Sequence, residues 1–183
     1  SELFRNEEFD QALRLGESLN ANMIETEIEE LKDPNIVENT PSSWYYSKRL
    51  LYSKLEDLRV NYNFDYVIDG MIMDDLDDFR PGLKARTEFG VRSVLQEIEL
   101  YKSEIRALSK SNDLPVWNKP ALCSLASRIP YGEPLNFTKV NKVNEAEKFI
   151  LSLNINHVRV RYHNNIARIE VDDTDIPVVI QYK

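Results

Sequence analysis

The feature that most constrains the fold is a short apolar run that leads directly into an acidic residue and a glycine, Tyr66-Val67-Ile68 before Asp69-Gly70. A compact apolar run of this kind is typical of a strand buried on both faces of a parallel sheet. In open α/β sheets, ligands bind beyond the carboxyl ends of the strands. The run therefore predicts an α/β fold in which Asp69 borders a ligand crevice.

Stretches with helical spacing of apolar residues surround this run. They begin at Asn6, at Thr40-Pro41, at Lys102 and at Thr138. Asn6, Thr40 and Thr138 are residue types that cap the start of a helix, and Pro41 favours the first helical position. A partly alternating stretch at residues 22–27 predicts a short strand. The pattern as a whole indicates helices mixed with strands.

Alternating residues near the C-terminal end predict a β-hairpin with a definite register. If Asn164-Asn165 forms a two-residue turn, four apolar residues fall on one face of the hairpin. They form two opposed pairs, Val158 with Val171 and Val160 with Ile169. This face is expected to pack against the rest of its domain.

The opposite face of the hairpin carries charge. Arg159 opposes Glu170, which is favourable, but Arg161 opposes Arg168, and like charges directly across two strands repel. A bound anion would relieve this repulsion. Alternatively, the arginines splay into solvent or pair with more distant carboxylates. The hairpin alone does not decide between these interpretations.

Composition excludes several classes of function. The 31 acidic and 23 basic side chains give a net charge of -8, which argues against general nucleic-acid binding. No uncharged apolar run is long enough to span a bilayer, so no membrane partner is expected. The single cysteine cannot form an internal disulfide or a multi-thiolate metal site, and this favours a reducing compartment, the cytoplasm.

That cysteine, Cys123, lies in an irregular stretch. Residues 120–137 contain three prolines and one glycine, and a stretch of this length is typical of a functional loop. A free cysteine is commonly a small buried hydrophobe. Cys123 also lies between Lys119 and Arg128, and nearby cations favour the reactive thiolate. Both interpretations stay open at this point.

Two further groups of residues could bind ligands. The acidic run formed by Asp74, Asp75, Asp77 and Asp78 has oxygen ligands for Mg²⁺, but such runs are usually solvated loops, and no metal site is predicted. Trp44 is expected in the first turn of a helix. There it would either line the core or stack on an aromatic ligand.

Three stretches taken together resemble the LarE family. They are Asn39-Thr-Pro-Ser-Ser-Trp-Tyr-Tyr46, Asp69-Gly70 through Phe79-Arg-Pro-Gly-Leu-Lys-Ala85, and Trp117 through Cys123 to Gly132, and the likeness extends through the hairpin to cover essentially the whole chain. LarE proteins are ATP-dependent sacrificial sulfur transferases of the PP-loop class, and they help to build the nickel-pincer cofactor of lactate racemase. The resemblance implies a Rossmann-like PP-loop sheet with helices over residues 1–119 and a smaller α+β domain with the hairpin over residues 120–183.

The resemblance also implies a set of site residues. Cys123 matches the sulfur donor. The positions that match or adjoin the substrate pocket are Trp44, Ser127, Arg159, Arg161, Glu147 and Glu170. The positions that border the nucleotide are Asp69, Gly70, Arg80 and Lys84. ATP and Mg²⁺ are the implied cofactors, and a pyridinium nucleotide with two carboxylates is the implied small-molecule substrate. Family members assemble as trimers or hexamers, so a homo-oligomer is expected.

The implied mechanism consumes the protein. ATP adenylates the substrate carboxylate, and the thiolate of Cys123 displaces AMP to form a thioester. Removal of the cysteine α-proton then releases a thiocarboxylate and leaves dehydroalanine at position 123. A single cysteine favours this route over relatives with several cysteines and a cluster. Each chain would deliver one sulfur.

The sequence departs from the family in one respect. The Ser-Gly-Gly-x-Asp-Ser loop that cradles pyrophosphate is absent from these residues, and the C-terminal domain stops soon after the hairpin. The expectation is a chain truncated at both ends, with negligible ATP-to-pyrophosphate exchange. Two alternatives remain: a PP-loop adenylating enzyme with another acceptor, such as an amidotransferase or RNA thiolase, or a non-catalytic nucleotide-binding or scaffold module.

Overall fold

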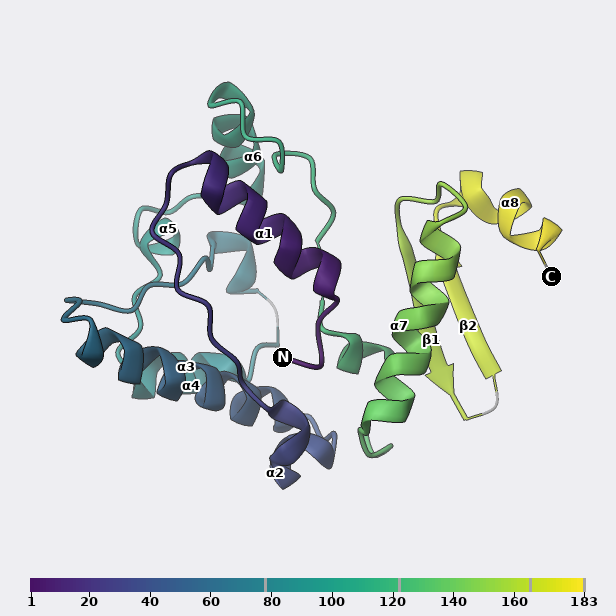
Figure 1. Cartoon of the computed structure of the whole chain (residues 1–183), viewed down its shortest axis with the longest axis horizontal. Helices are drawn as coiled ribbons and strands as arrows, with labels where there is room; N and C mark the ends of the chain where they lie inside the picture. Colours follow the sequence, from purple (N-terminus) through teal and green to yellow (C-terminus); the bar gives the residue numbers. More distant parts are fainter. Residues whose placement is uncertain (78, 122, 165, 183) are drawn as a thin grey trace. The chain divides into compact units, whose positions relative to one another are not determined.

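The computed structural model describes residues 1–77, 79–121, 123–164 and 166–182. Over these residues the chain is a mixed α/β protein with eight α-helices and a two-stranded antiparallel sheet (Figure 1). The helices are α1 (Asn6–Ser18), α2 (Pro34–Val37), α3 (Ser43–Asn61), α4 (Gly82–Glu88), α5 (Val94–Glu97), α6 (Lys102–Ser111), α7 (Phe137–Leu151) and α8 (Ile176–Gln181). The strands are β1 (Val158–His163) and β2 (Ile166–Val171), and 3-10 turns form η1 (Glu30–Lys32), η2 (Met73–Asp75), η3 (Leu125–Arg128) and η4 (Asp173–Asp175).

The chain divides into two compact units. One consists of Ser1–Thr40 and Leu122–Lys183, and the other of Pro41–Ala121. The junction after Ala121 lies close to the predicted boundary at residues 119 and 120. The grouping of the first forty residues with the C-terminal part was not anticipated from the sequence. The assignment of residues 1–119 and 120–183 to two functional domains stays a prediction.

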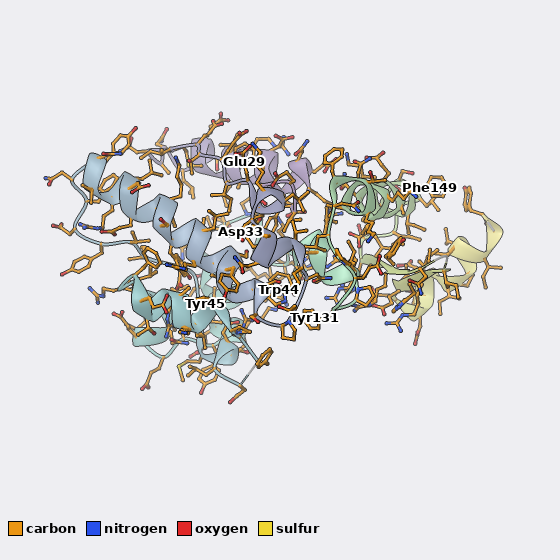
Figure 2. The ribbon with its side chains drawn as sticks, turned by 90° about the horizontal axis from the view of Figure 1, so that it is seen from below. Glu29, Asp33, Trp44, Tyr45, Tyr131 and Phe149 are labelled. Atoms are coloured by element: carbon orange, nitrogen blue, oxygen red, sulfur yellow. The ribbon has the colours of Figure 1, made fainter. Side chains whose placement is uncertain are left out.

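In the first unit, α7 packs against β1 (Figure 1). The buried core of this pair consists of Ile150, Ile155, Val158 and Val160. Because the two valines alternate along β1, the same face of the strand meets the helix at both positions. Phe149 lies on the outer part of α7 and makes an edge-to-face ring contact with Tyr182, with the ring centroids 6.3 Å apart (Figure 2).

The hairpin register is as predicted. Val158 pairs with Val171, Val160 with Ile169, and Arg161 with Arg168 across an antiparallel ladder. The two-residue turn was predicted at Asn164-Asn165. Asn164 has a φ of +53°, in the left-handed region that asparagine tolerates, and Asn165 lies outside the described residues.

The N-terminal residues of the first unit tie down the loop that carries Cys123. Three backbone hydrogen bonds connect the two segments: the amide of Leu125 donates to Leu3 O (2.8 Å), that of Gly132 to Asn39 O (2.9 Å) and that of Leu135 to Val37 O (2.8 Å). The loop is irregular between these bonds except for η3. It is therefore held on both sides of η3 by residues from the N-terminal segment of the same unit, which lies far away in sequence.

Asn39 strengthens this connection with its side chain. The residue is 3% exposed and has a φ of +54°. Its amide nitrogen lies 3.3, 2.9 and 3.0 Å from the carbonyl oxygens of Ile129, Pro130 and Glu133. A side-chain amide supplies two N–H donors, so three carbonyls share them. Asn39 thus fixes the second half of the loop.

The predicted helices form, with small shifts at their starts. α6 begins at the predicted residue, Lys102, whereas α1 has Arg5 as its N-cap, and Asn6, the predicted cap, is its first residue. α3 has Ser42 as its N-cap, two residues after Thr40. α7 is capped by Asn136 and not by Thr138, because the side chain of Asn136 accepts the amide of Lys139. None of the helices formed by the described residues is long and apolar enough to cross a membrane.

In the second unit, α3 packs against α4, and Tyr52, Ala85 and Val91 form the buried cluster. The predicted parallel strand is reduced to a single bridge between Ile68 and Arg92. Tyr66 and Ile68 are each 62% exposed, so the expectation of a strand buried on both faces is wrong for the described residues. Neighbouring strands that would cover the run are lacking there.

Two parts of the predicted fold therefore differ from the structure. The Rossmann-like PP-loop sheet is not among the elements that the described residues form. Residues 22–27 are irregular and form no strand. An extended segment becomes a strand only when a neighbour accepts its backbone hydrogen bonds, and sequence alternation alone does not supply one. The PP-loop sheet stays a prediction.

Candidate functional site

Cys123 is exposed. It precedes Ser124, the N-cap of η3, whose hydroxyl oxygen accepts the amide of Ala126 at 3.3 Å. The residues after the cysteine are buried, so the thiol projects from the start of a well-fixed turn. This exposure decides between the two interpretations of Cys123, because a small buried hydrophobe would lie inside the core.

A buried ion pair lies beneath the cysteine. The Nε of Arg128 lies 2.8 Å from Glu147 Oε1, and the two side chains are 2% and 1% exposed. Glu147 projects from α7, and its Oε1 also accepts the amide of Val160 on β1 at 3.0 Å. One carboxylate therefore connects the cysteine loop, the helix and the strand.

The rest of the Arg128 guanidinium faces the loop backbone. Nη1 donates to Ser127 Oγ at 2.7 Å and lies 3.5 Å from the carbonyl oxygens of both Cys123 and Ser124. Nη2 lies 3.5 Å from Glu147 Oε2. Every nitrogen of the guanidinium thus has an acceptor, as burial of a charged group requires.

Arg161 reaches the same loop from β1. Its Nη1 donates to the carbonyl of Ser127 at 3.3 Å, and its Nε to Glu170 Oε1 at 2.8 Å. The hydrogen bond to Glu170 is the main cause that raises the pKa of Arg161, and Coulomb attraction to Glu170 and to Cys123 adds to it. Arg161 therefore reaches the loop that carries Cys123 through the carbonyl of Ser127.

The repulsion predicted between Arg161 and Arg168 is relieved inside the protein. Glu170 Oε1 accepts from Arg161 and also from Arg168 Nη2, at 2.5 Å. These hydrogen bonds, that of Arg161 first, lower the pKa of Glu170 to about 2. Arg161 and Arg168 thus pair with a carboxylate of their own hairpin, and not with a distant carboxylate as the alternative to a bound anion had it.

Arg159 differs from its neighbour. It opposes Glu170 in the ladder as predicted, but the Glu170 carboxylate is bound to the other two arginines. Within residues 1–77, 79–121, 123–164 and 166–182, no carboxylate forms an ion pair with Arg159, and the side chain is half-buried. A half-buried guanidinium without a counter-ion is suited to bind an anionic group of a ligand.

Three of the predicted substrate residues therefore lie around Cys123. Ser127 and Arg161 are hydrogen-bonded to each other, and Glu147 underlies the same turn through Arg128. Both oxygens of Glu147 have partners within the chain, so the structure places it as a support of the loop. Their roles toward a substrate stay predictions.

Trp44 belongs to the other compact unit. It lies in the first turn of α3, next to Tyr45 (Figure 2). Its indole is partly exposed. The predicted role of Trp44 in stacking on a substrate stays a prediction.

The predicted nucleotide residues also belong to the second unit, and Asp69 is the most constrained of them. Its Oδ2 accepts from Tyr52 Oη at 2.9 Å, and its Oδ1 from Ser93 Oγ at 2.6 Å and from the amide of Met71 at 3.2 Å. Burial, and next the hydrogen bond to Asp69, raise the pKa of Tyr52. Asp69 thus stabilises the end of the parallel bridge. Gly70 follows it, and no atom lies within 4 Å of the position that a Cβ would take there.

Arg80 and Lys84 make separate contacts. Arg80 Nη2 lies 2.5 Å from Asp75 Oδ1, and Lys84 Nζ lies 5.0 Å from the ring centroid of Tyr45. The contacts found among the described residues do not join either cation to Asp69. The nucleotide-binding roles of Asp69, Gly70, Arg80 and Lys84 stay predictions.

The acidic run does not form a metal site within the described residues, where no group of three His, Cys, Asp or Glu side chains could hold an ion. Asp75 is engaged by Arg80 and by the amide of Ile72, and Asp74 accepts the amide of Lys102. Asp78 lies outside the described residues. The contacts of Asp74 and Asp75 leave no arrangement that fits a resident Mg²⁺ among the described residues, so we derive no step through a metal held there.

Comparison with known proteins identifies the family. No protein-family model matches the sequence. The chain is 49% identical, over 176 residues and 96% of its length, to the pyridinium-3,5-bisthiocarboxylic acid mononucleotide synthase of Lactiplantibacillus plantarum. The chain belongs to the LarE family. It spans 64% of the length of that relative.

Two further relatives of this LarE chain carry no functional name. An uncharacterized protein of Synechocystis is 41% identical over 83% of the chain, which spans 57% of that protein. An uncharacterized protein of Methanocaldococcus jannaschii is 28% identical over 90% of the chain, which spans 64% of it. The family resemblance inferred from the three sequence stretches is thus confirmed.

The LarE resemblance did not reveal the role of two buried residues. Arg128 was noted only as a cation near Cys123, and Asn39 only as part of a matching stretch. The sole sequence signal for Arg128 was a charged residue inside an irregular loop flanked by apolar residues. In the structure the side chains of both residues contact carbonyl oxygens of the cysteine loop. Asn39 does so from the N-terminal segment, and Arg128 does so from within the loop.

Proposed function

We propose that this LarE chain takes part in ATP-dependent sulfur insertion into a pyridinium dicarboxylate mononucleotide, during synthesis of the nickel-pincer cofactor, with Cys123 as the sulfur donor. The observation that carries the proposal is an exposed, sole cysteine in a loop that Arg161 reaches from β1 through its hydrogen bond to the carbonyl of Ser127. The name of the Lactiplantibacillus plantarum relative, a synthase of a bisthiocarboxylic acid mononucleotide, supports the substrate class.

The chemistry requires an activated acyl group. A carboxylate resists attack by a thiolate, so ATP first converts the substrate carboxylate to an acyl adenylate and pyrophosphate leaves. Mg²⁺ would arrive with the phosphates of the nucleotide and neutralise their charge. Asp69, Gly70, Arg80 and Lys84 would border this nucleotide in the PP-loop sheet.

The substrate would then be oriented at the hairpin. Arg159 has no ion-pair partner among the described residues and would bind the phosphate of the mononucleotide, with Arg161 beside it. Trp44 would stack on the pyridinium ring, and Ser127 would line the pocket. Glu147 and Glu170 hold Arg128 and Arg161 in place.

Sulfur transfer follows from the position of the thiol. The Cys123 thiolate attacks the acyl carbon and AMP leaves, which forms a thioester between protein and substrate. Loss of the Cys123 α-proton and cleavage of the Cβ–S bond release the thiocarboxylate and leave dehydroalanine. We also propose that the protein acts as a cytoplasmic homo-oligomer, a trimer or hexamer.

Product formation by a Cys123→Ser variant tests the proposal. The protein is supplied with ATP, Mg²⁺ and the dicarboxylate mononucleotide, and in a parallel arm with the preformed acyl adenylate. The proposal expects at most one sulfur transferred per wild-type chain and none from the variant. Thiolated product from Cys123→Ser in normal yield would exclude the cysteine as donor. Binding of nucleotide without any product in either arm would favour the non-catalytic alternative.

A further inference from the structure

The elimination step of the proposed function places charge on an atom that the structure describes. When the α-proton of an S-acylated cysteine is removed, the electron pair spreads onto the carbonyl oxygen of the same residue. That oxygen then carries the negative charge of an enolate. A donor that stabilises this oxygen lowers the barrier for elimination, as an oxyanion hole does for acyl transfer.

Arg128 faces the carbonyl oxygen of Cys123. Its Nη1 lies 3.5 Å from that oxygen. Among the described residues, no backbone N–H donates to the Cys123 carbonyl. In the turn that follows, the amide of Ser127 donates to Ser124 O and the amide of Ile129 to Ala126 O. The contact is long for a hydrogen bond, and such contacts tighten when charge develops on the acceptor.

Contacts with Glu147 and Ser127 hold the Arg128 guanidinium in its position beside the Cys123 carbonyl. Glu147 engages Nε and Nη2, and Ser127 Oγ engages Nη1, so the group cannot rotate away from the loop. It is also almost fully buried. A fixed cation in a water-poor site stabilises developing charge without reorganisation, and its field is stronger than it would be in solvent.

Arg161 has a different environment. Its Nε is bound to Glu170 and its Nη1 to the carbonyl of Ser127, four residues after the cysteine. Among the described residues, these hydrogen bonds do not reach the Cys123 carbonyl. Arg128 is therefore the arginine that faces this oxygen.

We propose that Arg128 is a catalytic residue of the elimination, where its guanidinium stabilises the enolate at the Cys123 carbonyl. This inference rests on the proposed function. In the step, a water or hydroxide at the exposed side of residue 123 takes the α-proton. The C–H electron pair forms the Cα=Cβ bond, the Cβ–S bond breaks, and its electron pair leaves on the sulfur of the thiocarboxylate. No external oxidant or reductant is needed.

The test needs a variant that removes the guanidinium without unfolding the protein. Arg128→Met alone leaves the carboxylate of Glu147 buried without its counter-charge, which is strongly destabilising. The double variant Arg128→Met/Glu147→Met removes both charges and keeps apolar volume, a change that proteins often tolerate. Arg106→Met is the matched control, because Arg106 also donates to a backbone carbonyl, that of Lys119, but in the other compact unit.

The assay separates elimination from adenylation. Cys123 is the sole cysteine, so transfer of the acyl group from a soluble aryl thioester of pyridine-3-carboxylic acid can form a new thioester at this residue alone. Intact mass then follows two events in each protein: gain of the acyl group, and its later loss with the elements of hydrogen sulfide. Added thiol traps the dehydroalanine as a second mass increase. Circular dichroism checks that each variant is folded.

The expected result is a split between the two events. Wild type and Arg106→Met acylate and then form dehydroalanine, whereas the double variant acylates normally but eliminates about 10²-fold more slowly, so that its thioester accumulates. Elimination by the double variant at the wild-type rate would overturn the role of Arg128 and leave the proposed function intact. A wild-type thioester that never yields dehydroalanine would overturn the inference and would also count against Cys123 as a sacrificial sulfur donor. The Cys123→Ser test of the proposed function measures thiolated product, so its outcome does not depend on the elimination rates compared here.

Discussion

The guanidinium of Arg128 and the carboxylate of Glu147 form a buried ion pair beneath Cys123, with Nε 2.8 Å from Oε1. The pair joins the cysteine loop to α7 and, through the amide of Val160, to β1. An irregular loop has no ladder of backbone bonds to define its shape. In this protein the shape is defined by three backbone hydrogen bonds from the N-terminal segment and by the side chains of Asn39 and Arg128, which reach the loop carbonyls.

Breaking this pair from one side is expected to destabilise the protein strongly. Arg128→Met should lower the free energy of unfolding by about 3–5 kcal/mol, because Glu147 is left buried and charged. The double variant Arg128→Met/Glu147→Met should lose much less unfolding free energy, because no charged group is left buried without its counter-charge. Urea unfolding followed by circular dichroism measures both. Equal losses in the single and double variants would show that the partner charge is not the cause.

The side-chain amide of Asn39 is expected to contribute measurably to the free energy of unfolding. Asn39→Gly keeps a backbone that adopts positive φ but removes the donor to three loop carbonyls, and it should cost about 1–3 kcal/mol of unfolding free energy. Asn39→Ala should cost about 1 kcal/mol more, because alanine is strained at a φ of +54°. Thermal unfolding of the two variants gives the order. Alanine as stable as glycine would contradict the backbone argument.

Glu170 predicts a dependence of stability on pH. Its folded-state pKa is depressed to about 2 by Arg161 and Arg168. A depressed pKa means that the ionised carboxylate stabilises the folded state above the ordinary pKa of glutamate, and that this contribution is lost as the pH falls toward 2. Solvent screening keeps it to about 1 kcal/mol or less, since the side chain is 34% exposed.

The comparison of wild type with Glu170→Gln tests this dependence. The difference in unfolding free energy should be constant from about pH 5 to 7 and should shrink below about pH 4.5. Urea titrations at several pH values measure it. A difference that grows as the pH falls would mean that Glu170 is not held ionised by the two arginines.

Tyr52 is expected to stabilise the second unit through Asp69. Its hydroxyl donates to Asp69 Oδ2 at 2.9 Å from a ring that is 3% exposed. Tyr52→Phe keeps the ring but leaves one carboxylate oxygen without this donor, which should cost about 1–3 kcal/mol. Tyr46→Phe, on the same helix, is the matched control. If both substitutions had the same small effect on urea unfolding, the hydroxyl contact would contribute nothing.

The helices and the hairpin could be predicted because their signals are local. The period of 3.6 in residues 102–111 and the alternation in residues 158–171 each depend on neighbours in sequence. The hairpin register followed from its turn alone, and with it the opposition of Arg161 and Arg168. The compensation by Glu170 could not be derived, because side-chain rotamers decide which of three nearby arginines a carboxylate contacts.

The supports of the cysteine loop could not be predicted for a different reason. Arg128 and Glu147 are 19 residues apart, and Asn39 is about 90 residues from the carbonyls it binds. Such contacts depend on tertiary packing, which no local period reports. The strand predicted at residues 22–27 failed for the same reason, because a strand needs a partner that the sequence pattern does not name.

The mass of the protein after one round of sulfur transfer tests the central claim most directly. After reaction with the acyl adenylate of the dicarboxylate mononucleotide, the peptide that contains Cys123 should have lost the elements of hydrogen sulfide, in the same molar amount as the thiolated product. An unchanged mass at position 123, with thiolated product present, would contradict the claim that this chain gives up its own sulfur.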